Sequence, residues 1–242
     1  MQKRFAGKTA VITGGASGIG LAIARRVIQE GGENVANDIN AEGVAALAAE
    51  LGEFGVAMVG DVTHEDDVAS LFSTAINRFG SVDASFHVAG ANKHAYIARM
   101  EEADWDFTIN LCLKGVMFAM KHAAQAMLKQ GHGAMVNIAS LNAHVPMHAG
   151  AAYSTAKAGV EMLTKNGALE LTPKDARPRG CCPSRPWSAR VVSVPSRGES
   201  IPSRADERRC AAASHPSHHR NDHGTFYAYQ TFIRFSCSLP DK

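Results

Sequence analysis

Apolar positions along the first 175 residues follow two different spacings, which predict strands and helices in alternation. Short apolar and β-branched runs predict strands at 8–13, 33–39, 55–59, 82–88 and 134–139. Apolar residues at helical spacing predict helices at 18–30, 41–51, 64–79, 100–130 (with a break near Asn110) and 153–171. Strands that alternate with helices in this way form a parallel sheet covered on both faces. The expected fold is a single doubly wound, Rossmann-like α/β domain over residues 1–175.

Residues 176–242 follow neither spacing and have a different composition. They hold 10 of the 15 arginines, 7 of the 9 prolines and 4 of the 5 cysteines, so they form an anomalous tail rather than a continuation of the domain. The segments 189–194 and 225–235 have strand composition, but nothing places them in register. A reading-frame shift is the preferred interpretation, and a diverged or disordered extension is the second. A metal site is the third and least favoured, because no Cys-x-x-Cys pair or matching histidine spacing organises its candidate ligands. Those candidates are the histidines and cysteines of the tail: His215, His218, His219, His223, Cys181, Cys182, Cys210 and Cys237.

The charge and hydropathy of the chain argue against two classes of partner. A net charge of +2 gives no reason to expect nucleic acid or an acidic surface. No stretch reaches the roughly 18 consecutive apolar residues of a membrane span, and no long apolar region precedes the first strand. We therefore expect a soluble, cytoplasmic protein that holds no metal.

A glycine-rich segment at 13–20 lies between the first expected strand and the first expected helix. Glycines here allow a tight turn and let backbone N–H groups approach a pyrophosphate at the start of the helix. Asp38 follows 18 positions after Gly20, at the end of the second expected strand, where a carboxylate can bind the adenosine ribose and repel a 2′-phosphate. Ser17 and Ile39 carry no positive charge to attract that phosphate. The pattern predicts a dinucleotide site that prefers NAD to NADP.

Tyr153 and Lys157 are four residues apart in an expected helix, so they lie on one face. A free tyrosine has a pKa of about 10, and its use near pH 7 to 8 requires ~3 to 4 kcal/mol in favour of the phenolate. One cation at ~4 Å supplies about 4 kcal/mol at an effective dielectric constant of ~20. The pair is therefore a candidate for acid/base chemistry, although such a pair alone is more often an ordinary surface feature.

Taken together, these residues resemble the short-chain dehydrogenase/reductase family over residues 1–175. Thr13-Gly14-x-x-x-Gly18-x-Gly20 is similar to its cofactor loop, and Asp61-Val62 to its adenine contact. Asn110, Ser140, Tyr153 and Lys157 are similar to its four catalytic residues, in family order and with Ser140 thirteen residues before Tyr153. The expected cofactor contacts are the following residues: Thr13, Gly14, Ser17, Gly18, Ile19, Gly20, Asp38, Asp61, Val62, Ala89, Gly90, Tyr153 and Lys157.

The resemblance implies a role for each catalytic residue. Tyr153 would exchange a proton with the substrate oxygen while hydride moves between the substrate and NAD. Ser140 would orient the same oxygen. Lys157 would lower the pKa of Tyr153 and hold the nicotinamide ribose, and Asn110 would anchor a water that continues the proton path.

One segment departs from the family pattern. His87-Val88-Ala89-Gly90 stands where the family shows Asn-Asn-Ala-Gly, so two amide side chains that brace this turn are replaced. We expect His87 to form structural hydrogen bonds in their place rather than to take part in catalysis. Several residues follow the active-site strands closely enough to line a substrate pocket, although most of them suit a loop surface better: His94, Tyr96, Leu141, His144 and Met147.

The sequence thus predicts an oxidoreductase that interconverts a secondary alcohol and a ketone with NAD(H). The alternative is a non-catalytic NAD-binding or inactive protein, because residues 176–242 replace the segment that normally contacts the substrate. The resemblance also implies a homodimer or homotetramer that pairs through the helices around Asn110 and Tyr153.

Overall fold

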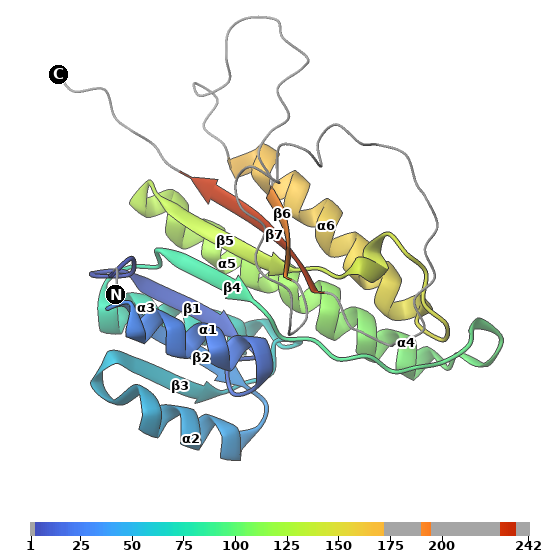
Figure 1. Cartoon of the computed structure of the whole chain (residues 1–242), viewed down its shortest axis with the longest axis horizontal. Coiled ribbons are helices and arrows are strands. Elements are labelled where there is room, and N and C mark those ends of the chain that lie inside the picture. Colours follow the sequence, from blue (N-terminus) through green and yellow to red (C-terminus); the bar gives the residue numbers. More distant parts are fainter. Residues whose placement is uncertain (1–2, 172–189, 195–227, 236–242) are drawn as a thin grey trace, which may run out of the picture.

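The central sheet contains five parallel strands and confirms the doubly wound α/β fold. The computed structural model describes residues 3–171, 190–194 and 228–235. The parallel strands are Thr9–Thr13 (β1), Glu33–Asp38 (β2), Gly55–Val59 (β3), Ala84–His87 (β4) and Gly133–Ile138 (β5). They lie in the order β3-β2-β1-β4-β5 (Figure 1). The direction of winding therefore reverses between β1 and β4, and ligands of such sheets bind beyond the carboxyl ends of the strands at this reversal.

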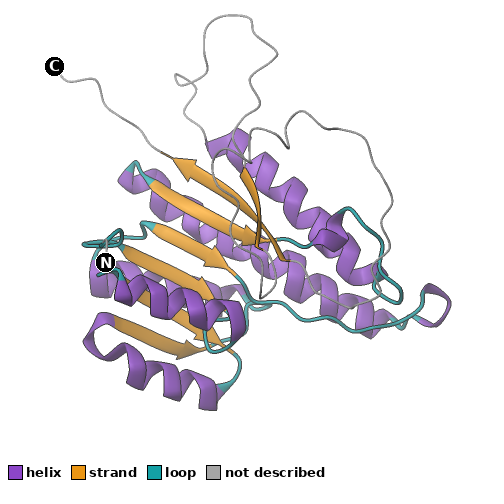
Figure 2. Ribbon diagram, viewed as in Figure 1, coloured by secondary structure: helices purple, strands orange, loops and turns teal. Residues whose placement is uncertain are grey.

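Helices connect the strands and lie close to their predicted positions (Figure 2). They are Gly18–Gln29 (α1), Ala41–Leu51 (α2), Glu65–Phe79 (α3), Glu102–Ile109 (α4), Gly115–Gln130 (α5) and Ala151–Leu171 (α6). The predicted break near Asn110 is a π-helical turn, Asn110–Lys114, between α4 and α5. Short 3₁₀ turns occur at Gly52–Phe54, Ile97–Arg99 and Leu141–Ala143.

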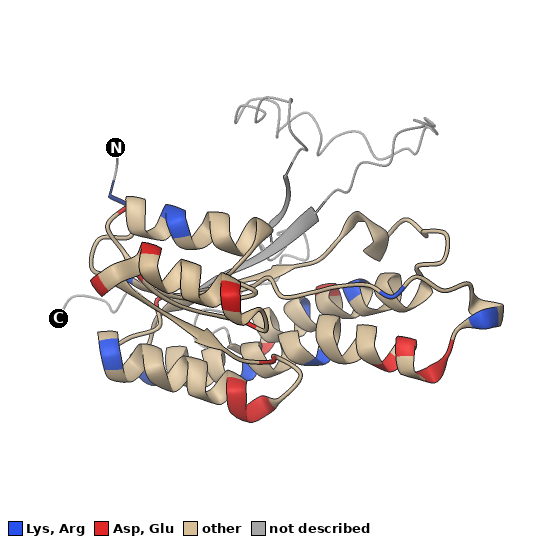
Figure 3. Ribbon diagram, turned by 90° about the horizontal axis from the view of Figure 1, so that it is seen from below, with Lys and Arg blue, Asp and Glu red and all other residues tan. Residues whose placement is uncertain are grey.

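Alternate residues of the inner strands supply the cores on the two faces of the sheet. Ile12 and Ala36 pack with α1 and α2 on one face, in a cluster that includes Leu47 of α2. Their neighbours Val11 and Val35 point to the other face, where α3, α5 and α6 cover them. The edge-on view shows helices on both sides of the sheet, with acidic and basic residues spread over them (Figure 3).

Beyond β5 the sheet continues with two antiparallel strands, for which the sequence predicted neither register nor direction. These strands are Ala228–Phe235 (β7) and Arg190–Val194 (β6), and they fall within the two segments of the tail that have strand composition. However, β7 pairs antiparallel with β5, and β6 pairs antiparallel with β7, so the sheet is parallel only across its first five strands. An antiparallel neighbour satisfies the open N–H and C=O groups of β5 as well as a parallel neighbour does, which is why strand composition alone could not predict direction.

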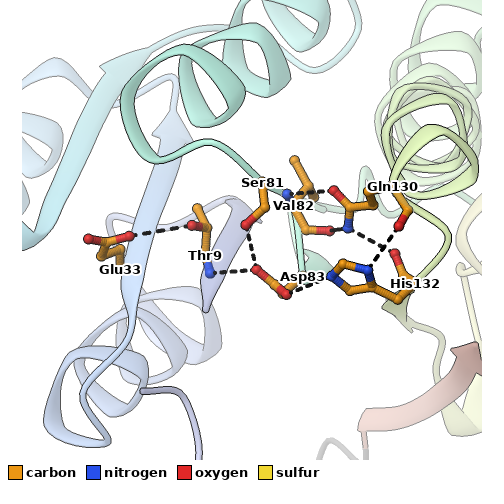
Figure 4. A network of polar contacts seen from close by, with 7 residues as sticks. All are labelled: Thr9, Glu33, Ser81, Val82, Asp83, Gln130 and His132. Carbon is orange, nitrogen blue, oxygen red and sulfur yellow. Dashed lines mark hydrogen bonds and ion pairs between the residues drawn. The ribbon is translucent and has the colours of Figure 1, made fainter. Parts of the chain in front are cut away.

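Side chains brace the amino ends of the central strands (Figure 4). The Asp83 carboxylate accepts hydrogen bonds from Thr9 N at 3.0 Å and lies 3.2 Å from His132 Nε2. The Gln130 side chain spans the same edge, accepting from Val82 N at 3.2 Å and donating to Val82 O at 2.7 Å. The network joins the starts of β1, β4 and β5 at the edge opposite the carboxyl ends.

Other predictions for the tail fall outside the described residues. These are the interpretations of 176–242 as a frame-shifted or disordered segment and the proposed metal ligands: Cys181, Cys182, Cys210, Cys237, His215, His218, His219 and His223. Within the described part of the chain, no group of three or more His, Cys, Asp or Glu side chains gathers as metal ligands would. No helix there is both long and apolar enough to cross a bilayer.

Candidate active site

The glycine loop after β1 is compact enough to exclude side chains at three positions, Gly14, Gly15 and Gly20. Gly14 has φ of +69°, and a Cβ there would lie 2.8 Å from the Cα atom of Ala89 in the turn after β4. A Cβ on Gly20 would lie 1.9 Å from Gly14 O, so α1 can pack this closely only with glycine at that position. Gly18 has φ of +50° at the start of α1 and nothing within 4 Å of its Cβ direction. The loop therefore brings the free N–H groups of α1 to an open surface, as a phosphate site requires.

Asp38 holds this loop against the end of β2. Its Oδ2 atom accepts a hydrogen bond from Ala16 N at 3.1 Å, and its Oδ1 atom accepts one from Asn40 N at 3.1 Å. The carboxylate is half-buried, while the neighbouring Ile39 is 70% exposed. The side chain expected to select the cofactor thus lies at the loop that would bind its phosphates.

A cleft lies at the carboxyl ends of β1 to β4. Eight of the predicted cofactor contacts line it: Gly14, Ser17, Gly18, Ile19, Asp38, Val62, Ala89 and Gly90. Sequence reasoning missed six more lining residues that have no motif of their own: Asn37, Ile39, Gly60, Val88, Ala91 and Leu111.

Two predicted cofactor contacts, Thr13 and Asp61, are not among the residues that line the cleft. The Thr13 hydroxyl accepts a hydrogen bond from Val88 N at 3.1 Å and so joins β1 to the turn after β4. The Asp61 carboxylate accepts one from Thr63 N at 2.8 Å and fixes its own turn. Both residues support the shape of the cleft.

The acid/base candidates lie in the first turns of α6, next to the end of β5. Lys157 is 3% exposed, and its Nζ atom donates a hydrogen bond to Ile138 O at 2.7 Å. The same Nζ atom lies 5.6 Å from the centre of the Tyr153 ring. Ser140 is 4% exposed, lies close enough to Tyr153 to lower the pKa of its phenol, and accepts a hydrogen bond from Asn142 N at 3.2 Å. The structure therefore brings Ser140, Tyr153 and Lys157 together.

The pKa of Tyr153 shifts opposite to the expected direction. Burial raises it above the ordinary value, the hydrogen bond from Ser140 lowers it, and Cys112 raises it further. Burial also lowers the pKa of Lys157, because an ammonium group loses hydration inside the protein. Burial, rather than the Lys157 ammonium, therefore has the largest effect on the pKa of Tyr153 in this structure, and the role of Lys157 stays a prediction. At neutral pH the Tyr153 phenol is protonated and can donate a proton.

Cys112, rather than Asn110, lies near this group. Cys112 is fully buried; its Sγ atom donates a hydrogen bond to Ala91 O at 3.0 Å, and Cys112 Sγ and Lys157 Nζ both lie within 4 Å of the position that a Cβ on Gly90 would take. Asn110 is half-buried, and its side chain makes no hydrogen bond to another described residue. The cause is the π-helical turn, in which Gly115 N bonds Asn110 O five residues earlier, so helical spacing cannot identify the residue that faces α6.

Gly90 joins the cleft to the acid/base residues. It lines the cleft, and a Cβ at Gly90 would lie 3.4 Å from Cys112 Sγ and 3.6 Å from Lys157 Nζ. A ligand that follows the cleft past Gly90 therefore arrives at Lys157. The open N–H groups of α1 and the cradle formed by Gly14 and Gly90 fit a dinucleotide of the nicotinamide type, with its phosphates at α1.

The expectation of structural hydrogen bonds for His87 is confirmed. The side chain is 1% exposed, and its two ring nitrogens lie 2.6 Å from Ser85 Oγ and 2.5 Å from Asn137 Oδ1. Burial lowers its pKa to about 4, so the ring is neutral at physiological pH.

The five candidates for a substrate pocket have different surroundings. His94 and Tyr96 are exposed, while Leu141 and Met147 are half-buried. His144 Nε2 forms an ion pair with Glu161 Oε2 of α6 at 2.9 Å and thereby ties the loop after Ser140 to the helix that carries Tyr153.

Comparisons with known proteins agree with this geometry. A family model described as short chain dehydrogenase matches residues 8–186. A cis-4-hydroxycyclohexanecarboxylate dehydrogenase of Sinomonas cyclohexanicum is 35% identical, over 89% of this chain and 84% of its own. A 3beta-hydroxysteroid dehydrogenase of Eggerthella lenta is 37% identical, over 74% of this chain and 71% of its own. A short chain dehydrogenase from Mycobacterium smegmatis has a similar crystal structure, with a TM-score of 0.66 and 30% identity over 69% of this chain and 72% of its own.

Proposed function

Because the chain belongs to the short-chain dehydrogenase family, whose members are oxidoreductases, we propose that it interconverts a secondary alcohol and a ketone with NAD(H). The observation that carries the proposal is the position of Tyr153, which contacts Ser140 and lies beside Lys157 where the cleft ends at Gly90. Two similar proteins named above are dehydrogenases of a hydroxycyclohexane and a hydroxysteroid, which supports a secondary alcohol as the substrate class.

The chain's own residues account for the proton in this reaction. NAD(H), when bound, supplies or accepts the hydride. Ser140 orients the substrate oxygen by a hydrogen bond, and the protonated phenol of Tyr153 donates a proton to that oxygen during ketone reduction. The ammonium of Lys157 is fixed by Ile138 O and stabilises negative charge that develops on the phenol.

The choice of cofactor is tested by kinetics with a panel of cyclic ketones. We expect kcat/KM for NADH to exceed that for NADPH by at least about 30-fold, because the half-buried Asp38 carboxylate opposes a 2′-phosphate by about 2 kcal/mol after allowance for solvent screening. Asp38→Asn should reduce this ratio several-fold. The matched control is Glu53→Gln, which removes an exposed carboxylate at the opposite end of β3. Equal activity with both cofactors in the wild type would rule out this role for Asp38.

Two variants test whether Asn110 or Cys112 supports Lys157 in the reaction. The family resemblance favours Asn110, whereas the contacts favour Cys112. We expect Cys112→Ala to lower kcat about tenfold, because it removes the buried thiol that holds Ala91 O next to Gly90 and Lys157, and Asn110→Ala to change kcat less than threefold. Circular dichroism would show that both variants are folded. A larger loss in Asn110→Ala would restore the assignment taken from the family.

We also propose a cytoplasmic homodimer or homotetramer. Exposed apolar side chains on α4 and α6, namely Trp105, Phe107, Met162 and Leu169, support pairing through these helices. The mass in solution, measured by light scattering, would decide between the two states and a monomer. The alternative of a non-catalytic NAD-binding protein is favoured if NADH binds but no ketone in the panel is reduced.

A further inference from the structure

His87 begins a chain of buried polar side chains that the proposed proton transfer does not use. Ser85, His87 and Asn137 are at most 1% exposed; Ser85 and His87 belong to β4, and His87 and Asn137 lie at the carboxyl ends of β4 and β5. The strand register places His87 directly beside Asn137. The chain continues to α6, where Asn137 Nδ2 donates a hydrogen bond to Thr164 Oγ1 at 2.8 Å. Thr164, which is fully buried, then donates to Val160 O at 2.6 Å.

The direction of each proton in this chain follows from the donors and acceptors. Asn137 uses its NH₂ group toward Thr164, so its Oδ1 atom faces His87 and can only accept. His87 Nδ1 must then carry the ring proton, and Nε2 accepts a hydrogen bond from the Ser85 hydroxyl at 2.6 Å. The neutral His87 tautomer with its proton on Nδ1 therefore gives Ser85, His87 and Asn137 a matching donor or acceptor at each contact. Protonation of the ring would leave two donors facing each other at Ser85 or force that hydroxyl to turn.

The two ends of the chain reach the two halves of the active site. His87 is the last residue of β4, and the next residues, Val88 to Gly90, line the cofactor cleft. Thr164 follows Lys157 by seven residues, about two turns later on the same side of α6. The chain is therefore a rigid link between the cleft edge and the helix that carries Tyr153.

We propose that His87 is a positioning residue, which through Asn137 and Thr164 sets the register of α6 against β4 and so places Tyr153 relative to the cleft at Gly90. This inference rests on the proposed function. Apolar contacts between a helix and a sheet tolerate small shifts along the helix axis, whereas a buried hydrogen bond is lost after such a shift. A chain in which every group is satisfied therefore selects one register.

Thr164→Val tests the inference, because it replaces the buried hydroxyl with a methyl group of similar size. We expect kcat for ketone reduction to fall about tenfold while KM for NADH stays within twofold, since the cofactor loop is untouched and Tyr153 is displaced. Thr164→Ser keeps the hydroxyl and should restore kcat to within threefold of the wild type. The matched control is Thr74→Val in α3, which removes the same kind of bond, Thr74 Oγ1 to Ser70 O at 2.8 Å, outside the chain.

Three results would overturn the inference. One is an unchanged kcat in Thr164→Val; a second is an equal loss in Thr164→Val and Thr164→Ser. The third is independent of any variant's folding: ¹⁵N NMR of the wild type, with His87→Asn to assign the signal, must show a proton on Nδ1, and a proton on Nε2 contradicts the chain. A wild type that binds NADH but reduces no ketone would instead refute the proposed function, and the positioning role with it.

Discussion

Tyr153→Phe is expected to lower kcat for ketone reduction by about 10³-fold, which corresponds to about 4 kcal/mol in the barrier. The phenol is the proposed proton donor, and in its half-buried position a water molecule would be less well oriented to replace it. Phenylalanine retains the ring beneath the Lys157 ammonium, so the packing of α6 should be unchanged. Turnover is followed by the loss of NADH absorbance.

NADH binding by Tyr153→Phe shows whether the variant has lost only the chemical step or also its folded cofactor site. Its dissociation constant, measured by fluorescence titration, should change less than about twofold in Tyr153→Phe, because the cleft is formed by the glycine loop and the strand ends. Tyr96→Phe is the matched control, since Tyr96 is 62% exposed. A Tyr153→Phe enzyme that retains a tenth or more of the wild-type kcat would rule out the proposed proton donor.

The second large effect is a loss of stability in mild acid that depends on His87. The pKa of His87 is about 4 in the folded protein and about 6.5 when unfolded, so between these values the unfolded chain binds more protons. The contribution of the neutral His87 ring to the free energy of unfolding is therefore fully present above pH 6.5 and decreases as the pH falls toward 4. The contribution of this one residue is about 1.4 kcal/mol per pH unit, or about 3 kcal/mol in total.

Denaturant unfolding of the wild type and His87→Asn at several pH values isolates this contribution. The variant is expected to be less stable at neutral pH but to lose less stability between pH 6.5 and 4. His94→Asn, at an exposed position, should retain the wild-type slope. Parallel curves for the wild type and His87→Asn would show that the ring is not held neutral.

The fold was predictable from sequence because its signals are local. The alternation of strand and helix spacings predicted the five parallel strands, and the helix bounds follow it closely even at α2 and α6. The position of Asp38 beside the glycine loop was also predictable, because it ends the strand that follows the first helix, 18 residues after Gly20. What lies beyond residue 171 carries no such spacing, and the antiparallel direction of β7 depends on a distant edge of the sheet.

The contacts around the site were less predictable, because they depend on pairs of residues far apart in the chain. His87 and Asn137 are 50 residues apart, and Asn137 and Thr164 are 27 apart. No periodic pattern connects them. The position of Cys112 near Lys157 depends on one backbone turn that differs from an α-helix. The raised pKa of Tyr153 depends on its burial in the folded chain, which no local pattern predicts.

The π-helical turn between α4 and α5 also has a consequence for how this site can evolve. A π-turn holds one more residue than an α-turn, so the segment Asn110–Lys114 carries an extra residue within an otherwise continuous rod. Removing one residue there would restore an α-helical turn, with the flanking helices in nearly their present orientation, and would change which side chains of the segment face α6. Insertions and deletions in this segment would therefore exchange the side chain presented toward Lys157 without any substitution.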